Sequence, residues 1–291
     1  MYKTAENAKT DEETLALYKK ELSMGEQLYG LEHPIIAELC YKIGIIYYFK
    51  GFGWEEIFID LGLEYLTRAL AIKEKILGAE KPTLGCICYI IGSIYFEKSN
   101  YNKALEFFKK EFSEREKLYG IEHPKTIELY DGIGLTHYYN KNYDTAIEFF
   151  NKTIDFYEKS GDDKYLATNR IYFFIANAYY YKNNFDNART FYKKDLFVNE
   201  KIYGLEHPKT EESYINLGDL YFAKGDFSLA LDFYKKALSV HEKIFIEEDE
   251  DLESYYDRVH DERLFYQDID LARDFDEKVL ALKEKIHSLE N

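Results

Sequence analysis

At residues 28–34 the chain reads Leu-Tyr-Gly-Leu-Glu-His-Pro, and closely similar heptapeptides return at residues 118–124 and 202–208. A degenerate copy at residues 76–82 keeps the glycine, the glutamate and the proline. All four prolines of the chain end a copy, at positions 34, 82, 124 and 208, so the intervals are 48, 42 and twice 42 residues. A fixed period of about 42 residues indicates an array of stacked structural repeats.

Two amphipathic helices are predicted between consecutive heptapeptides, most clearly after residue 208. Tyr214, Leu217 and Tyr221 recur at spacings of three and four, which predicts a first helix over residues 210–224. Gly225-Asp226 predicts a short turn, and a second helix begins near residue 227. Each heptapeptide is then a joint, in which the glycine ends one helix and the proline opens the next.

The pattern Tyr214-x-x-Leu217-Gly218-x-x-Tyr221, followed by Ala230, Tyr234 and Ala237, resembles the tetratricopeptide repeat. The Gly-x-x-His-Pro joints and the period of 42 resemble the kinesin light chain group and its bacterial relatives. The resemblance covers nearly the whole chain. It implies an all-α fold, a right-handed α-solenoid of tetratricopeptide-like helix pairs. It also implies that the first helices line a concave side, where partners bind.

Small residues set the register of the array. They recur in the first helices at Gly44, Gly92, Gly134, Ala176 and Gly218, and in the second helices at Ala104, Ala146, Ala188 and Ala230. We expect the two helices of a pair to cross closely there, because a larger side chain would push them apart. This register predicts a single repeat array over residues 1–291, divided into an N-terminal half-unit (1–30), repeat 1 (31–77, with an insertion at 52–60), repeat 2 (78–119), repeat 3 (120–160), repeat 4 (161–203), repeat 5 (204–245) and a degenerate capping repeat (246–291).

Two segments depart from the repeat. The insertion holds the only tryptophan, Trp54, and we interpret Trp54, Ile57 and Phe58 as an extension of the second helix that covers the end of the stack. A binding loop on one face is the alternative. The acidic run at residues 247–251 is interpreted as a solvated linker, with a docking strip for a basic partner as the alternative.

The charge and composition of the chain limit the kinds of molecule it is expected to bind and where it is expected to act. The chain carries 38 basic and 54 acidic residues, a net charge of −16, which argues against binding nucleic acid or anionic membranes. Three cysteines, Cys40, Cys86 and Cys88, do not have the spacing of a disulfide framework. Neither a signal peptide nor an apolar run long enough to span a bilayer is recognised, so we expect a cytoplasmic protein.

Catalytic motifs are not recognised either. The sequence holds no P-loop, no Gly-x-Gly-x-x-Gly after a strand, no His-Glu-x-x-His and no Cys-x-x-Cys. The histidines of the joints, His33, His123 and His207, are interpreted as structural because each precedes a helix-opening proline. We therefore expect no enzyme activity, no metal site and no cofactor.

The predicted binding surface lies one step round the first helices from the packing face. The candidate residues are Tyr41, Tyr48, Tyr89, Phe96, Asp131, Tyr138, Phe173, Asn177, Tyr180, Asp219 and Phe222. One column of this surface is aromatic in all five repeats: Tyr48, Phe96, Tyr138, Tyr180 and Phe222. Aromatic side chains are common anchors of peptide-binding surfaces. The alternative is that the column packs between neighbouring first helices.

The expected partner is a protein or peptide segment with apolar anchors and with lysine or arginine, because acidic residues surround the aromatic ones. A clamp for a C-terminal carboxylate is not expected, since only Asn177 is of the required type and no lysine accompanies it. The predicted function is a non-enzymatic interaction scaffold. The alternative is a regulatory peptide-sensing receptor whose superhelix changes pitch on binding.

Overall fold

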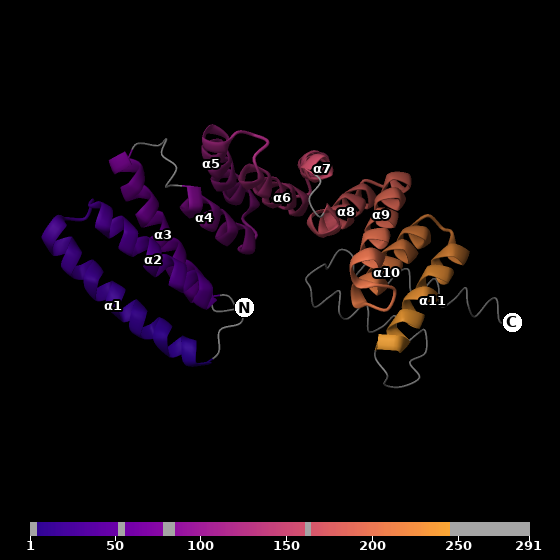
Figure 1. Ribbon diagram of the computed structural model, residues 1–291, viewed down its shortest axis with the longest axis horizontal. Coiled ribbons are helices and arrows are strands. Elements are labelled where there is room, and N and C mark those ends of the chain that lie inside the picture. Colours follow the sequence, from indigo (N-terminus) through magenta and orange to yellow (C-terminus); the bar gives the residue numbers. More distant parts are fainter. Residues whose placement is uncertain (1–4, 52–55, 78–84, 161–163, 245–291) are drawn as a thin grey trace. The chain divides into compact units, whose positions relative to one another are not determined.

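A computed structural model describes residues 5–51, 56–77, 85–160 and 164–244, and this part of the chain is helical throughout, apart from its turns (Figure 1). The helices are α1 (Ala5–Tyr29), α2 (Pro34–Gly51), α3 (Glu56–Leu77), α4 (Gly85–Glu97), α5 (Tyr101–Tyr119), α6 (Pro124–Tyr139), α7 (Tyr143–Ser160), α8 (Lys164–Tyr181), α9 (Phe185–Tyr203), α10 (Pro208–Ala223) and α11 (Phe227–Ile244). The predicted all-α class is confirmed. Within the described residues, no helix is long and apolar enough to cross a bilayer.

The chain divides into two compact units, and the boundary between them along the sequence falls after Thr153. In the first unit α2 packs against α3 and α4 against α5, and in the second α8 packs against α9 and α10 against α11 (Figure 1). Successive pairs are joined by contacts such as those of α5 with α6 and of α9 with α10. Each unit is therefore a stretch of α-solenoid built from sequential helix pairs, as predicted.

Close approach inside each pair depends on the small residue of the first helix. A Cβ added at Gly134 would lie 2.7 Å from Cε1 of Phe150, and one at Gly92 would lie 2.8 Å from Cε1 of Phe108. Gly44 faces Leu66 in the same way, at 2.7 Å from Cγ. The steric reason for the small residue is confirmed. Its partner is a large side chain of the second helix, four residues after the small residue of that helix.

The heptapeptide is a joint, as predicted. Gly120 adopts φ 87°, ends α5 and donates its N–H to the carbonyl of Glu116, and Pro124 opens α6. His123 caps the new helix, because its Nδ1 accepts the backbone N–H of Lys125 at 3.2 Å. Its ring also stacks on Tyr119, with the ring centroids 4.7 Å apart. The recurrence of histidine is thus explained by capping and stacking.

The other two intact joints repeat this geometry. Nδ1 of His33 accepts from Ile35 at 3.3 Å, and Nδ1 of His207 accepts from Lys209 at 3.1 Å. The rings of His33 and His207 stack on the tyrosine four residues earlier, at 4.7 Å and 4.5 Å. Accepting a backbone N–H requires an unprotonated Nδ1, so the cap uses the imidazole tautomer that carries its proton on Nε2.

A second recurrent turn joins the two helices of a pair. The carbonyl of Phe96 accepts the N–H of Ser99 at 2.9 Å, and the carbonyl of Tyr95 accepts the N–H of Asn100 at 2.8 Å, which is the Schellman arrangement. This turn places one residue in the left-handed region, at Ser99 (φ 55°), Lys141 (φ 60°), Asn183 (φ 56°) and Gly225 (φ 78°). Only one of the four is the glycine that this conformation favours.

The insertion is partly described. α3 begins at Glu56, so Ile57 and Phe58 extend the second helix as interpreted, and Phe58 stacks on Tyr47 at 6.0 Å. Ile57 is 67% exposed and does not cover the stack. Trp54, the degenerate joint at 78–82, the acidic run and the capping repeat lie outside the described residues.

Candidate protein-interaction surface

The aromatic column lies at the corners of the helix pairs. Four of its members contact the aromatic residue that opens the following helix, with centroid separations of 5.8 Å for Phe96–Tyr101, 5.7 Å for Tyr138–Tyr143, 5.8 Å for Tyr180–Phe185 and 5.0 Å for Phe222–Phe227. All four contacts are edge-on, which is a favourable aromatic geometry. The column therefore has a packing role in four repeats.

The five aromatic side chains of this column differ in their solvent exposure. Tyr138 and Phe222 are each only 7% exposed, whereas Tyr48, Phe96 and Tyr180 are half-buried. The edge-on contacts described for the two buried rings are with the second helix of their own pair, which differs from the packing between neighbouring first helices considered as the alternative. The half-buried rings keep part of their surface available for contact.

Tyr48 links two neighbouring first helices. Its hydroxyl donates to Oε1 of Glu97 at 2.9 Å, which ties the end of α2 to the end of α4. Burial raises the pKa of both the Tyr48 hydroxyl and the Glu97 carboxyl above their usual values, and the nearby Glu97 charge raises the pKa of Tyr48 further. The pair supplies a carboxylate beside an aromatic ring on the predicted surface.

Two predicted surface residues are buried for a reason that the sequence pattern did not reveal. Asn177 and Asp219 each accept a hydrogen bond from a tyrosine of the second helix, Tyr192 and Tyr234, and the Tyr234–Asp219 distance is 2.7 Å. In the second and third repeats the second-helix residue is phenylalanine, which has no hydroxyl to satisfy. Asn177 and Asp219 thus serve an internal hydrogen bond.

The remaining predicted residues form the accessible part of the surface. Tyr89 is 42% exposed, while Tyr41, Asp131 and Phe173 are half-buried. A cation lies over two of these rings: Nζ of Lys73 is 5.4 Å from the centroid of Tyr41, and Cζ of Arg115 is 6.0 Å from that of Tyr89.

Arg115 is also held by acceptors. Its Nε donates to the buried carboxylate of Glu111, and one terminal nitrogen contacts the carbonyl of Lys125 and, at 3.4 Å, the carboxylate of Glu128. Burial raises the pKa of Glu111, and the hydrogen bond and charge of Arg115 oppose that shift. The arginine therefore compensates a buried carboxylate at the contact between α5 and α6.

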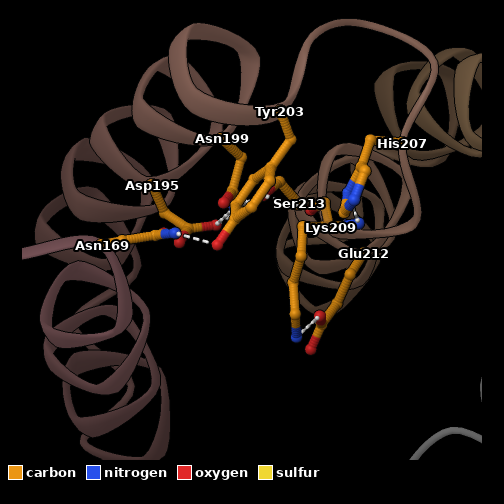
Figure 2. Close-up of polar contacts among 8 residues, drawn as sticks. All are labelled: Asn169, Asp195, Asn199, Tyr203, His207, Lys209, Glu212 and Ser213. Atoms are coloured by element: carbon orange, nitrogen blue, oxygen red, sulfur yellow. Dashed lines mark hydrogen bonds and ion pairs between the residues drawn. The ribbon is translucent and has the colours of Figure 1, made fainter. Parts of the chain in front are cut away.

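A buried polar cluster lies at the corresponding place in the second unit (Figure 2). Ser213 donates to Oδ2 of Asp195 at 2.5 Å, and the amide nitrogen of Asn199 lies 3.3 Å from the same oxygen and 2.7 Å from Oγ of Ser213. Burial raises the pKa of Asp195 to about 7, although the bond from Ser213 favours the ionised form. Whereas Arg115 hydrogen-bonds Glu111, the hydrogen bonds described for Asp195 come from neutral groups, and Lys209 acts on it only as a nearby charge.

This cluster was not predicted from the sequence, although the sequence carries a signal for it. The position of Asp195 in the repeat is filled by Ala69, Glu111, Thr153, Asp195 and Ala237. A carboxylate at a position that otherwise takes small residues indicates a buried charge. Within the described residues, no group of histidine, cysteine and acidic side chains could hold a metal ion.

Comparison with known proteins supports the architecture. A sequence family described as tetratricopeptide repeat matches residues 83–159 and 162–243. No curated protein sequence matches the chain.

Solved structures share the fold at low sequence identity. The TPR-like repeats of a candidate kinesin light chain from Podosopora anserina are 18% identical, with a TM-score of 0.59 over 72% of this chain and 97% of that one. BtubC from P. vanneervenii is 15% identical, with a TM-score of 0.59 over 86% and 96%. Aspartyl phosphate phosphatase F from Bacillus subtilis is 11% identical, with a TM-score of 0.60 over 90% of this chain and 63% of that one. At such identities the likeness concerns the fold alone, and the predicted resemblance to kinesin light chain-type repeats and bacterial relatives is confirmed at that level.

Proposed function

Since the chain belongs to the tetratricopeptide repeat family, whose members are generally protein–protein interaction modules, we propose that it is a non-enzymatic scaffold of the cytoplasm. It binds an extended or helical segment of a protein partner on the face that its first helices present. The repeat boundaries, the binding residues and the absence of catalysis are all parts of this proposal.

One observation carries the proposal: the first helices of the first unit leave part of the Tyr41 and Tyr89 rings accessible, one face of each ring being under Lys73 or Arg115, and a carboxylate lies at Tyr48 on the same helices. Tyr89 is 42% exposed, Tyr41 is half-buried one pair earlier, and Glu97 lies near Tyr48 on the same face. An aromatic ring contributes a large contact area at low entropic cost, and a partly desolvated carboxylate selects a basic group. The surface therefore suits a segment with apolar anchors and with lysine or arginine.

The likeness to a phosphatase does not change this proposal. It rests on 11% identity, and the chain spans 63% of that protein's length. Fold alone does not carry an activity from one protein to another.

The test compares three forms of the protein as bait for partners from the cells that encode it. The binding variant combines Tyr41→Ser and Tyr89→Ser, and the control variant is Leu118→Ser, which changes an equally exposed apolar residue of a joint. We expect proteins that the wild type and the control capture to be lost with the binding variant. Equal capture by all three forms would show that the partners do not bind through Tyr41 and Tyr89 on the first-helix face, and would refute the proposal.

A further inference from the structure

At one position of the first helices, the position of Tyr41 and Tyr89, a cation of the second helix lies over the aromatic ring in two repeats, and another repeat has the ring but a neutral residue in place of that cation. The position of Arg115 is filled through the array by Lys73, Arg115, Tyr157, Asn199 and His241. Lys73 lies over Tyr41, and Arg115 lies over Tyr89. The equivalent ring in the second unit is Phe173, which is half-buried, but the residue at the position of Arg115 is the uncharged Asn199.

The acceptors that hold Arg115 also have equivalents, 84 residues later. Glu111 corresponds to Asp195, Glu128 corresponds to Glu212, and the carbonyl of Lys125 corresponds to that of Lys209. Asp195 is 4% exposed, and within the described residues it accepts hydrogen bonds from the neutral Ser213 and Asn199, while the ammonium of Lys209 acts on it only as a nearby charge. The second unit thus repeats a set of two carboxylates, a carbonyl and an aromatic ring, with an uncharged and shorter side chain at the arginine position. Its carbonyl, that of Lys209, accepts the hydroxyl of Ser213 at 3.1 Å, which an arriving guanidinium would have to share or displace.

Asn199 provides an independent sign that a donor is missing. It is 3% exposed, and its Oδ1 is buried with no hydrogen-bond partner. An unsatisfied buried carbonyl oxygen destabilises the fold, because it has given up its hydrogen bonds to water. A donor brought by a ligand would satisfy that oxygen and the carboxylate beside it.

We propose that Phe173, Asp195, Glu212 and the carbonyl of Lys209 form a receptor for the guanidinium group of an arginine in the partner segment. This inference rests on the proposed function and specifies the chemistry of its partner. A guanidinium offers five donors in one plane and stacks on aromatic faces, which matches several acceptors around a ring. A lysine ammonium offers three donors from one point and matches the set less well.

The two units show how the site would open. In the second unit Nζ of Lys209 pairs with Glu212 at 2.8 Å, and both side chains are about half exposed beside Ser213 (Figure 2). In the first unit the equivalent Lys125 lies over the ring of Tyr119 at 5.0 Å, and Glu128 contacts Arg115 instead. We expect an arriving guanidinium to take Glu212 and to move Lys209 toward the ring of Tyr203.

The test uses N-acetyl-arginine methylamide as the probe and N-acetyl-citrulline methylamide as its neutral isostere. Binding is followed by amide chemical shifts of α9 and α10 in the full chain at pH 7.5. We expect the arginine probe to shift these amides with a dissociation constant at least about tenfold lower than that of citrulline, because ionised hydrogen bonds are the stronger ones. Equal binding of the two probes, or no shift with either, overturns the proposal.

Two variants locate the site. Asp195→Asn should lower arginine binding to the citrulline level, whereas Glu206→Gln, which removes an exposed carboxylate of the neighbouring joint, should leave it unchanged. Asn199→Arg should supply the guanidinium from the chain itself, as Arg115 does, and so raise the melting temperature and abolish probe binding. Arginine binding that survives Asp195→Asn would contradict the assignment.

Failure of this inference is separable from failure of the proposed function. The arginine probe addresses only α8, α9 and α10, whereas the capture experiment changes Tyr41 and Tyr89 in the first unit. If that variant loses capture and the arginine probe does not bind, the proposed scaffold function stands and the proposed arginine site is wrong.

Discussion

Replacing Asp195 by asparagine is expected to stabilise the protein at neutral pH and to have little effect in acid. The carboxyl is 4% exposed, and burial raises its pKa from 3.8 to about 7. Between these values the unfolded chain has released the proton and the folded chain still holds it, so stability falls as the pH rises. Above about pH 7 the Asp195 carboxyl is ionised in both the folded and the unfolded chain, and stability falls no further.

The size of the effect follows from the shift. One pKa unit corresponds to about 1.36 kcal/mol, so the wild type loses up to roughly 4 kcal/mol of stability between about pH 4 and pH 7. Asparagine has no proton to release, and it can accept the bond from Ser213 as the carboxyl does. The stability difference between variant and wild type should therefore grow across this range and become constant above it.

Urea denaturation of both proteins at pH 4.5, 5.5, 6.5 and 7.5 measures that difference, with Glu206→Gln as a control that keeps the pH dependence of the wild type. A stability difference that is the same at pH 4.5 and 7.5 would refute the reasoning. So would a variant that is less stable than the wild type at pH 7.5, because the carboxylate would then be compensated within the fold.

Three further predictions concern the helix crossings, the turns within helix pairs and the joints of the array, and urea denaturation measures each of them. Gly134→Ala should destabilise by about 1–3 kcal/mol, because the new Cβ would meet the ring of Phe150, whereas Gly132→Ala in the same helix meets nothing within 4 Å and should be neutral or stabilising. Equal effects of the two would contradict close crossing at Gly134. Lys141→Gly should stabilise by about 1 kcal/mol, since φ is 60° there, and Gly225→Ala should destabilise by a similar amount; the same sign for both would refute the strained turn. His123→Ala should cost about 1 kcal/mol by removing the helix cap, and His123→Asn should recover most of it; no difference between them would argue against capping.

The fold could be predicted from the sequence because the repeated heptapeptides fix the register of the helices. Glycine and proline mark each joint, and the period of 42 then assigns every position to a face. Even the recurrent histidine could be interpreted as structural before its capping bond at Nδ1 was known. The register does not predict how deeply each side chain is buried.

Asn177 and Asp219 illustrate that limit. Both lie on the predicted face by spacing, yet each bonds a tyrosine hydroxyl on the second helix, at Tyr192 and Tyr234. The sequence contains both members of each pair, but they lie 15 residues apart on different helices, and only the crossing geometry brings them together. Likewise Tyr138 and Phe222 are buried by an edge-on contact with the next helix, a contact that a face assignment alone does not predict.

The most direct test of the central claim is photo-crosslinking in the cells that encode the protein. The photoreactive p-benzoylphenylalanine replaces Tyr89 on the first-helix face in one form, and in the other it replaces Phe197, an equally exposed ring on the second helix α9. The account predicts a specific crosslinked protein from position 89 and none from position 197. Crosslinks to the same protein from position 197 only, or from neither position, would contradict a partner bound on the first-helix face.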